Sequence, residues 1–250
     1  MKNLYFLLPI AAILLVSSCK KDSPVITKTP DVAVVKRLNT DSVSFIVNGK
    51  LYTNSSDYGY FSREYGNSGT NLKLSSSPGD WYISGGKKDT YWVGTADSVQ
   101  YHSSSLATLK GDDGGIRFAF IKNNKRANML LRGAFYVPNI NENLYTLNDY
   151  KYAIDYGREG KDDGVAITFL NAGQIMSSYS PISINAKSTL TAESQKDAKF
   201  KITKIEEVKG TDNVIIEATF EANLFDKDEK PTKVTNGFLR LTTLKYGVRF

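Results

Sequence analysis

Cysteine and histidine are almost absent from this chain of 250 residues, which has one of each, Cys19 and His102. A zinc site draws three or four ligands mainly from these two residue types, so their scarcity argues against structural or catalytic zinc. A Ser-His-Asp set needs a histidine base, and the chain has no Gly-x-Ser-x-Gly motif. We therefore predict no metal and no other cofactor, assign no catalytic residue, and interpret His102 as an exposed loop residue.

The chain also lacks a long hydrophobic run and a strong charge of one sign. The longest apolar run, residues 4–16, has about 13 residues and is shorter than the roughly 20 that a membrane-spanning helix needs. The 32 Lys and Arg residues only modestly outnumber the 26 Asp and Glu residues, and they are spread along the chain. Without a basic cluster that interleaves with aromatic residues, nucleic acid is a poor candidate partner.

The N-terminal region has the order of an export signal. Lys2 precedes the apolar run, which closes on the tetrapeptide Val-Ser-Ser-Cys at residues 16–19. This tetrapeptide resembles the lipobox read by lipoprotein signal peptidase, and a single cysteine has no partner for an internal disulfide. We expect residues 1–18 to be a lipoprotein signal peptide and Cys19 to be lipidated; the alternative is an ordinary secretory signal with a chance cysteine.

The predicted anchor fixes the expected location. Several acyl chains, such as palmitate, on Cys19 would hold the protein stably at a membrane. Residues 19–40 are polar, contain two prolines and read as a flexible tether. Lys20 in the second mature position, rather than an Asp, favours the cell outer membrane, in its periplasmic or its surface leaflet. The globular domain is expected over residues 41–250.

The domain shows mostly the two-residue period of β-strands. Residues 42–53 alternate around Asn48-Gly49, a strong signal for a hairpin with a type I′ turn. Further short segments rich in β-branched and aromatic residues are 71–75, 81–84, 91–93, 116–121, 129–135, 165–170, 182–185, 199–206, 213–222 and 235–243. We predict an all-β fold, an antiparallel β-sandwich or partly open barrel, with residues 189–198 as a loop or one short helix.

Two similar turns leave open a division of the domain into two related halves. The segment at residues 110–114 precedes one predicted strand, and the similar segment at residues 161–164 precedes another. They could mark equivalent strands of a duplicated unit. Alternatively they are two similar hairpin turns, because Asp-Gly is common in such turns.

Aromatic residues supply the candidate ligand-binding site. Trp81, Tyr82 and Trp92 lie in one short region next to Asp and Lys residues, and exposed aromatic rings of this kind stack on sugars. The alternative, which we favour for at least one of the two tryptophans, is that they are core residues on facing strands of one hairpin across the Gly85-Gly86 turn.

Acidic residues offer two weaker possibilities. A pair of carboxylates across a cleft could hydrolyse a glycoside, but a sequence does not show their separation. The segment at residues 226–230, Asp-Lys-Asp-Glu-Lys, lacks the glycine and the distant glutamate of a calcium loop, so we interpret it as a solvated hairpin turn.

Three short motifs resemble a group of uncharacterised Bacteroidetes lipoproteins that share a domain of unknown function. Residues 44–52 resemble its opening strand pair with Asn-Gly-Lys, residues 143–147 are similar to its middle motif, and residues 214–222 with Thr-Asn-Gly-Phe at 235–238 resemble its closing pair. The chain departs from the group at Glu217-Ala218, where the group has Ser-Gly. The resemblance implies a β-sandwich-like envelope lipoprotein and transfers no functional residue.

The sequence thus predicts a lipid-anchored cell-envelope protein that is a non-enzymatic binding module for a glycan or an envelope partner. A carbohydrate-active hydrolase using paired acids and a purely structural envelope protein are the alternatives.

Overall fold

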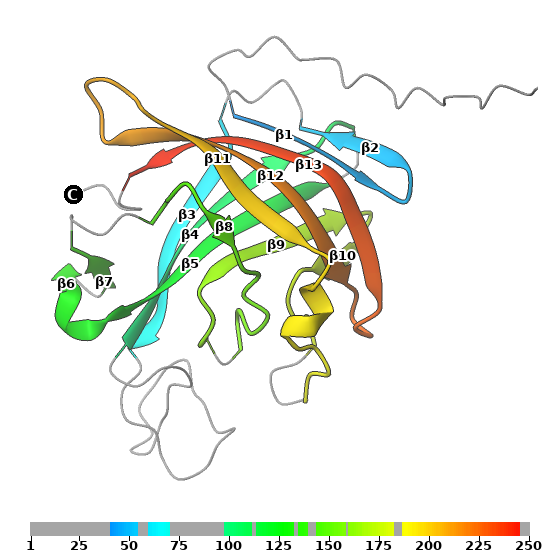
Figure 1. The fold of residues 1–250 in the computed structure, drawn as a ribbon, viewed down its shortest axis with the longest axis horizontal. Coiled ribbons are helices and arrows are strands. Elements are labelled where there is room, and N and C mark those ends of the chain that lie inside the picture. Colours follow the sequence, from blue (N-terminus) through cyan, green and yellow to red (C-terminus); the bar gives the residue numbers. More distant parts are fainter. Residues whose placement is uncertain are drawn as a thin grey trace, which may run out of the picture. The chain divides into compact units, whose positions relative to one another are not determined.

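The computed structural model describes residues 41–54, 60–70, 98–111, 114–132, 135–139, 144–158, 160–182 and 187–245. All of them belong to one compact unit, residues 38–250. Within these ranges the chain forms strands and two short 3-10 helices, and one antiparallel sheet curls strongly into a half-barrel (Figure 1). The prediction of an all-β fold with a partly open barrel is confirmed. No described helix is long and apolar enough to cross a membrane.

The strands follow the chain in the order β1 (Ser42–Val47), β2 (Lys50–Thr53), β3 (Ser62–Thr70), β4 (Ser98–Thr108), β5 (Gly115–Lys125), β6 (Met129–Arg132), β7 (Phe135–Pro138), β8 (Asp149–Tyr150), β9 (Gly164–Asn171), β10 (Gln174–Ser177), β11 (Lys199–Glu207), β12 (Asn213–Phe225) and β13 (Pro231–Leu244). The 3-10 helices are η1 (Arg126–Asn128) and η2 (Ala192–Gln195). In the described part of the chain, the main sheet has the order β2-β1-β13-β12-β10-β9-β5-β4-β3, with β11 paired to β12 and β8 to β11. The pair β6-β7 stands apart from it.

The predicted first hairpin is present. Val47 pairs with Lys50, and the two residues between them, Asn48 and Gly49, have φ angles of 50° and 78°. Both values are positive, as the type I′ turn requires, and Asn and Gly adopt them at the lowest cost. The turn chemistry therefore sets the register of β1 against β2.

The sheet curls far enough for β2, its first strand, to reach the end of β4, which lies next to its last strand, β3. Asn54, just after β2, forms a β-bridge with Leu109, just after β4. Next to this bridge, the amide of Lys110 donates a hydrogen bond to the carbonyl oxygen of Thr53 over 3.0 Å. Bulges interrupt the strand pairs β1-β13, β11-β12 and β12-β13, and bulges increase the local twist and bend of a strand. Residues 53–54 and residues 109–110 are thus joined by a bridge and a hydrogen bond.

Aromatic rings fill the inner face of the curled sheet, and Phe220 of β12 lies at their centre. Its ring centroid is 5.2 Å from that of Phe118 on β5, 6.1 Å from that of Phe200 on β11 and 6.3 Å from that of Phe45 on β1. All four rings are buried. β1 and β5 are not neighbours in the sheet, so this ring connects distant strands, as does Phe169 of β9, whose centroid is 5.3 Å from that of Phe45.

The motif Thr-Asn-Gly-Phe at residues 235–238 is explained by the packing around this ring. Gly237 pairs with Phe220, and a Cβ atom on Gly237 would lie 2.5 Å from Cγ and Cδ2 of Phe220 and 2.5 Å from its carbonyl oxygen. Asn236 occupies the bulge with a φ of 52°, a conformation that Asn tolerates better than most residues. The glycine is therefore required by close packing and the asparagine by the backbone.

Two segments differ from the predicted strands. Residues 129–135 are not one strand: Arg132 pairs with Phe135, so β6 and β7 form a hairpin. Gly133-Ala134 between them is a two-residue Gly-x connection, a hairpin signal that the apolar run obscured. Ile182 lies in a bend rather than a strand, and residues 183–186 are outside the described ranges, as are the predicted strands at 71–75, 81–84 and 91–93.

The remaining expectations have mixed outcomes. Residues 189–198 contain one 3-10 turn, η2, in agreement with the expected loop or short helix. At its start, the amide of Thr191 donates a hydrogen bond to Oγ of Ser194 over 3.0 Å. The segment at residues 110–114 connects the antiparallel pair β4-β5, as a hairpin turn does. The segment at residues 161–164 is not a hairpin turn, because β8 before it pairs with β11 and not with β9. The two strands that follow these segments, β5 and β9, are direct neighbours in one sheet.

The close contact between Gly237 and Phe220 predicts that a larger residue at position 237 destabilises the fold. Replacement Gly237→Ala should lower the free energy of unfolding by about 1–3 kcal/mol, because the new methyl group overpacks the core. Chemical denaturation of the purified protein measures this. In a Phe220→Leu background the loss should shrink only in part, since the carbonyl oxygen of residue 220 still opposes the methyl group. An unchanged unfolding midpoint for Gly237→Ala would contradict the packing described here.

Candidate functional site

The sequence-predicted site residues lie outside the described ranges. This holds for Cys19, the expected lipidation site, and for Trp81, Tyr82 and Trp92, the expected ligand contacts. Their roles stay predictions. The structure instead draws attention to residues that the sequence did not single out.

His102 is not an exposed loop residue, as the sequence suggested, but lies in the middle of β4. It is half-buried and pairs with Ile121 of β5 on one side and with Gly66 of β3 on the other. The serine-rich sequence around it was misleading because Ser103 and Ser105 face the interior. There the hydroxyl of Tyr145 donates a hydrogen bond to Oγ of Ser103 over 3.0 Å, which satisfies a polar group that a strand would otherwise bury unpaired.

On the outer face of the sheet, opposite the aromatic core, five side chains form what we call the outer-face cluster. They come from three strands and two loops that are remote in the sequence, and they are Glu64 of β3, His102 of β4, Arg117 of β5, Tyr156 and Tyr179. Strand alternation puts them there, because the neighbours of Arg117 in β5, Ile116 and Phe118, point into the core.

The contacts within the outer-face cluster are specific. The ring of Tyr156 lies nearly perpendicular to His102, with centroids 5.8 Å apart, and nearly perpendicular to Tyr179, with centroids 5.2 Å apart. Nη2 of Arg117 is 3.5 Å from Oε2 of Glu64. The tyrosines pack on a small apolar cluster of alanine and isoleucine side chains from β5, β9 and the segment between β8 and β9. The hydroxyl of Tyr179 is also 3.0 Å from Oγ1 of Thr168, which limits its movement.

Burial keeps His102 and Tyr156 of the outer-face cluster neutral near pH 7. Burial lowers the pKa of His102 below its ordinary value of 6.5; the Glu64 carboxylate opposes this shift and the Arg117 guanidinium adds to it. Burial, and next the neighbouring Tyr179, raise the pKa of Tyr156 to about 12. The imidazole and the phenol are therefore uncharged, and the only charges are those of Arg117 and Glu64, which oppose each other.

Two carboxylates are buried in the described chain, and both have structural partners. Asp41 accepts hydrogen bonds from the amides of Phe61 over 2.9 Å and Thr242 over 2.5 Å; burial still raises its pKa. Oε1 of Glu217 is 2.5 Å from Nη1 of Arg240, directly across β12 and β13. Neither pair is accessible to a substrate, because their side chains are almost fully buried.

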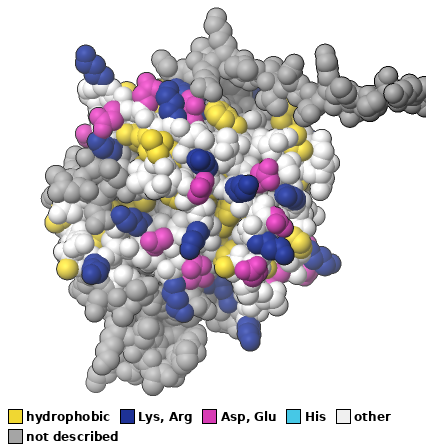
Figure 2. Space-filling view, in the orientation of Figure 1, with side chains coloured by type: hydrophobic (Ala, Val, Ile, Leu, Met, Phe, Trp, Pro, Cys, Tyr) yellow, Lys and Arg dark blue, Asp and Glu magenta, His cyan; other side chains and the backbone are white. Residues whose placement is uncertain are grey.

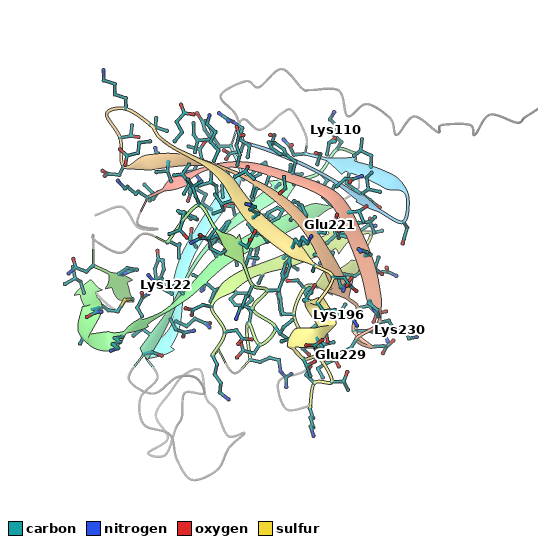
Figure 3. All side chains as sticks on the ribbon, viewed as in Figure 1. Lys110, Lys122, Lys196, Glu221, Glu229 and Lys230 are labelled. Atoms are coloured by element: carbon teal, nitrogen blue, oxygen red, sulfur yellow. The ribbon has the colours of Figure 1, made fainter. Side chains whose placement is uncertain are left out.

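Glu229 accepts four hydrogen bonds and ties a hairpin to a loop. It accepts the hydroxyls of Ser180 and Ser188, each over 2.6 Å, and both the amide and the hydroxyl of Thr189. Despite partial burial, which opposes it, these bonds lower its pKa to about 2. Figure 3 shows Glu229 at the end of the β12-β13 hairpin, beside η2. Each carboxylate oxygen of Glu229 accepts two hydrogen bonds from this chain, so we interpret Glu229 as a structural residue that holds the loop to the hairpin and not as a reactive acid.

The segment at residues 226–230 is the predicted hairpin turn between β12 and β13. Oδ1 of Asp226 accepts the amides of Asp228 and Lys230, each over 2.9 Å, so this carboxylate closes its own turn. Nζ of Lys227 contacts the Asp228 carboxylate over 2.9 Å. Among the residues described, no group of three or more His, Cys, Asp or Glu side chains is placed to hold a metal ion.

The outer surface otherwise carries mixed charge. Figure 2 shows Lys and Arg side chains interspersed with Asp and Glu side chains over the face it presents. Exposed pairs of the described chain, such as Lys204 with Glu206 and Lys233 with Glu221, likewise combine charges of opposite sign. Exposed pairs of this type add little to stability, and they give this face no field of a single sign.

No protein-family model matches the chain, and neither a curated protein nor a solved structure does. The case for a function therefore rests on the chain's own residues.

The burial of His102 predicts its titration. In the folded protein, the NMR chemical shift of the Cε1 proton of His102 should change with pH, with a midpoint below 6.5. Because the pKa of His102 is lower in the folded state, the unfolded chain binds the proton first as the pH falls. The stability contributed by neutral His102 is therefore complete above about pH 6.5 and is lost as the pH falls below that value. The variant His102→Gln should lose this part of the pH dependence.

A matched variant tests the cause. In Glu64→Gln the midpoint should fall further, since the lost carboxylate is the group that raises the pKa of His102. A midpoint at or above 6.5 in the unmodified protein would contradict the burial of His102.

Proposed function

We propose that this protein is a lipid-anchored cell-envelope protein whose β domain is a non-enzymatic binding module for a glycan or an envelope partner. The anchor is supported by the apolar run at residues 4–16 and by Cys19, the only cysteine in the chain. We further propose the outer membrane as its location, since Lys20 follows Cys19.

The observation that carries the binding role is the outer-face cluster. It brings two tyrosines, an imidazole and an exposed Arg-Glu pair to one place on a rigid sheet, and such mixed aromatic and polar surfaces are typical of recognition sites. Hydrolysis of a glycoside would need two accessible carboxyl groups that face each other. The buried acids Asp41 and Glu217 are instead occupied by amides and by Arg240.

The anchor is tested by cell fractionation of the full chain produced in a bacterium that processes lipoproteins. Wild-type protein should sediment with membranes and incorporate labelled palmitate, and Cys19→Ala should lose both properties, because the thiol is the acceptor. The control Ser18→Ala should keep both, since alanine is also small. Palmitate labelling that persists in Cys19→Ala would overturn the proposed anchor.

The binding role is tested with the full chain in detergent micelles on a panel of glycans and envelope proteins. We expect saturable binding, and a loss of it in Trp81→Ala or Trp92→Ala if the predicted aromatic segment takes part. Circular dichroism before and after each assay shows whether a variant is folded. Absence of binding to every glycan would overturn the glycan role, whereas absence of binding to all probes would favour a structural role.

A further inference from the structure

We propose that the outer-face cluster binds a neutral sugar, with adjacent hydroxyl groups of one ring bridging Arg117 and Glu64 beside the ring of Tyr156. This inference rests on the proposed function as a glycan-binding module, and it adds the described residues that contact the ligand and a ligand class.

The charge of the outer-face cluster selects a neutral ligand. Arg117 and Glu64 carry opposite charges 3.5 Å apart, and the neighbouring imidazole and phenol rings are uncharged near pH 7. An acidic sugar would gain from Arg117 but would meet the Glu64 carboxylate, and a cationic ligand would meet the reverse arrangement. A ligand without charge pays neither cost.

The donors and acceptors of the cluster match a pair of hydroxyl groups. A guanidinium only donates hydrogen bonds and a carboxylate only accepts them, whereas a sugar hydroxyl does both. The Arg117 and Glu64 side chains are 38% and 61% exposed, so a ligand can reach both. Their separation of 3.5 Å is long for a hydrogen bond between charged groups, so the pair has bonding capacity that a bridging hydroxyl can use.

The aromatic rings are fixed before a ligand arrives. Tyr156 is held between His102 and Tyr179, each nearly perpendicular to it, and Tyr179 is held in turn by Thr168. A ring whose orientation is already set loses little conformational entropy on binding, which favours the weak contacts that sugars make.

Other exposed ion pairs in the described ranges lack these features. Lys204 with Glu206 and Lys233 with Glu221 also lie on strands of the sheet, but they use lysine, which does not present the planar, two-pronged donor of arginine. The second pair has an aromatic neighbour, Tyr152, whose hydroxyl donates to the carbonyl oxygen of Glu221 over 2.8 Å, but this ring is buried and cannot contact a ligand. The pair Lys233 with Glu221 therefore supplies a matched control.

The single histidine provides the measurement. Because His102 is the only histidine in the chain, selective labelling gives one imidazole signal in a spectrum of the full chain in detergent micelles. The probes are cellohexaose, xylohexaose and mannohexaose, with hexagalacturonate as the acidic counterpart. We expect at least one neutral probe to shift the His102 signal saturably and hexagalacturonate to leave it unchanged.

Variants locate the contact. Arg117→Gln should weaken binding of the neutral probe about tenfold or more, because it removes a charged donor. Tyr156→Ala should weaken it similarly, and Lys233→Gln should change it less than about twofold, as an exposed pair outside the site. Arg117 is exposed on the outer face, so Arg117→Gln is expected to fold and still tests the site if Tyr156→Ala does not fold. Circular dichroism checks the folding of each variant.

The outcomes separate this inference from the proposed function. If a neutral probe binds but neither moves the His102 signal nor responds to Arg117→Gln, the site is wrong while the glycan role stands. If only hexagalacturonate binds, the ligand class is wrong. If none of the four probes binds, the inference is overturned, and the broader glycan panel decides separately whether the proposed function falls with it.

Discussion

The packing of the Phe220 ring on Gly237 is the interaction on which the rest of the domain depends. The missing side chain of Gly237 leaves the Phe220 ring room to lie over β13, from where it contacts Phe118 of β5 and Phe45 of β1, two strands that are not neighbours in the sheet. Removing a buried phenylalanine ring costs about 3–5 kcal/mol, a large share of the roughly 5–15 kcal/mol that holds a domain folded. The curl of the sheet and the central ring are thus one structural unit.

The same packing positions the outer face. In β5, Phe118 points inward against Phe220 and Arg117 points outward beside Glu64, because successive side chains of a strand alternate. A shift of β5 by one residue would exchange the two, placing a guanidinium in the aromatic core and a phenyl ring in the outer-face cluster. The core therefore holds the register that the strand residues of the cluster need, and the two loops supply Tyr156 and Tyr179.

Features that depend on neighbouring residues could be predicted from the sequence, whereas contacts between residues far apart in the chain could not. The hairpin at Asn48-Gly49 and the alternating strands near the C-terminus were predictable, because turn residues and a two-residue period act over a few positions. Strand β4 was missed because its inward serines are satisfied by Tyr145, which is 42 residues away from Ser103. The outer-face cluster draws on five separate segments, so no spacing could have revealed it, although the outward position of Arg117 between Ile116 and Phe118 was a usable sign.

The place of β13 in the sheet has a consequence for the order of events in folding. This strand lies between β1 and β12, and the amide of Thr242 donates to the carboxylate of Asp41, 201 residues earlier. The first strand consequently has no main-sheet neighbour except its own hairpin partner until β13 has been synthesised. Contacts this distant in sequence form slowly, so the β1-β2 hairpin would lack its neighbour in the sheet until the end of synthesis, although β4, β5, β9 and β10 can pair with one another before then. An apolar strand edge that stays open for so long is prone to aggregate, and chaperones that cover it would aid folding.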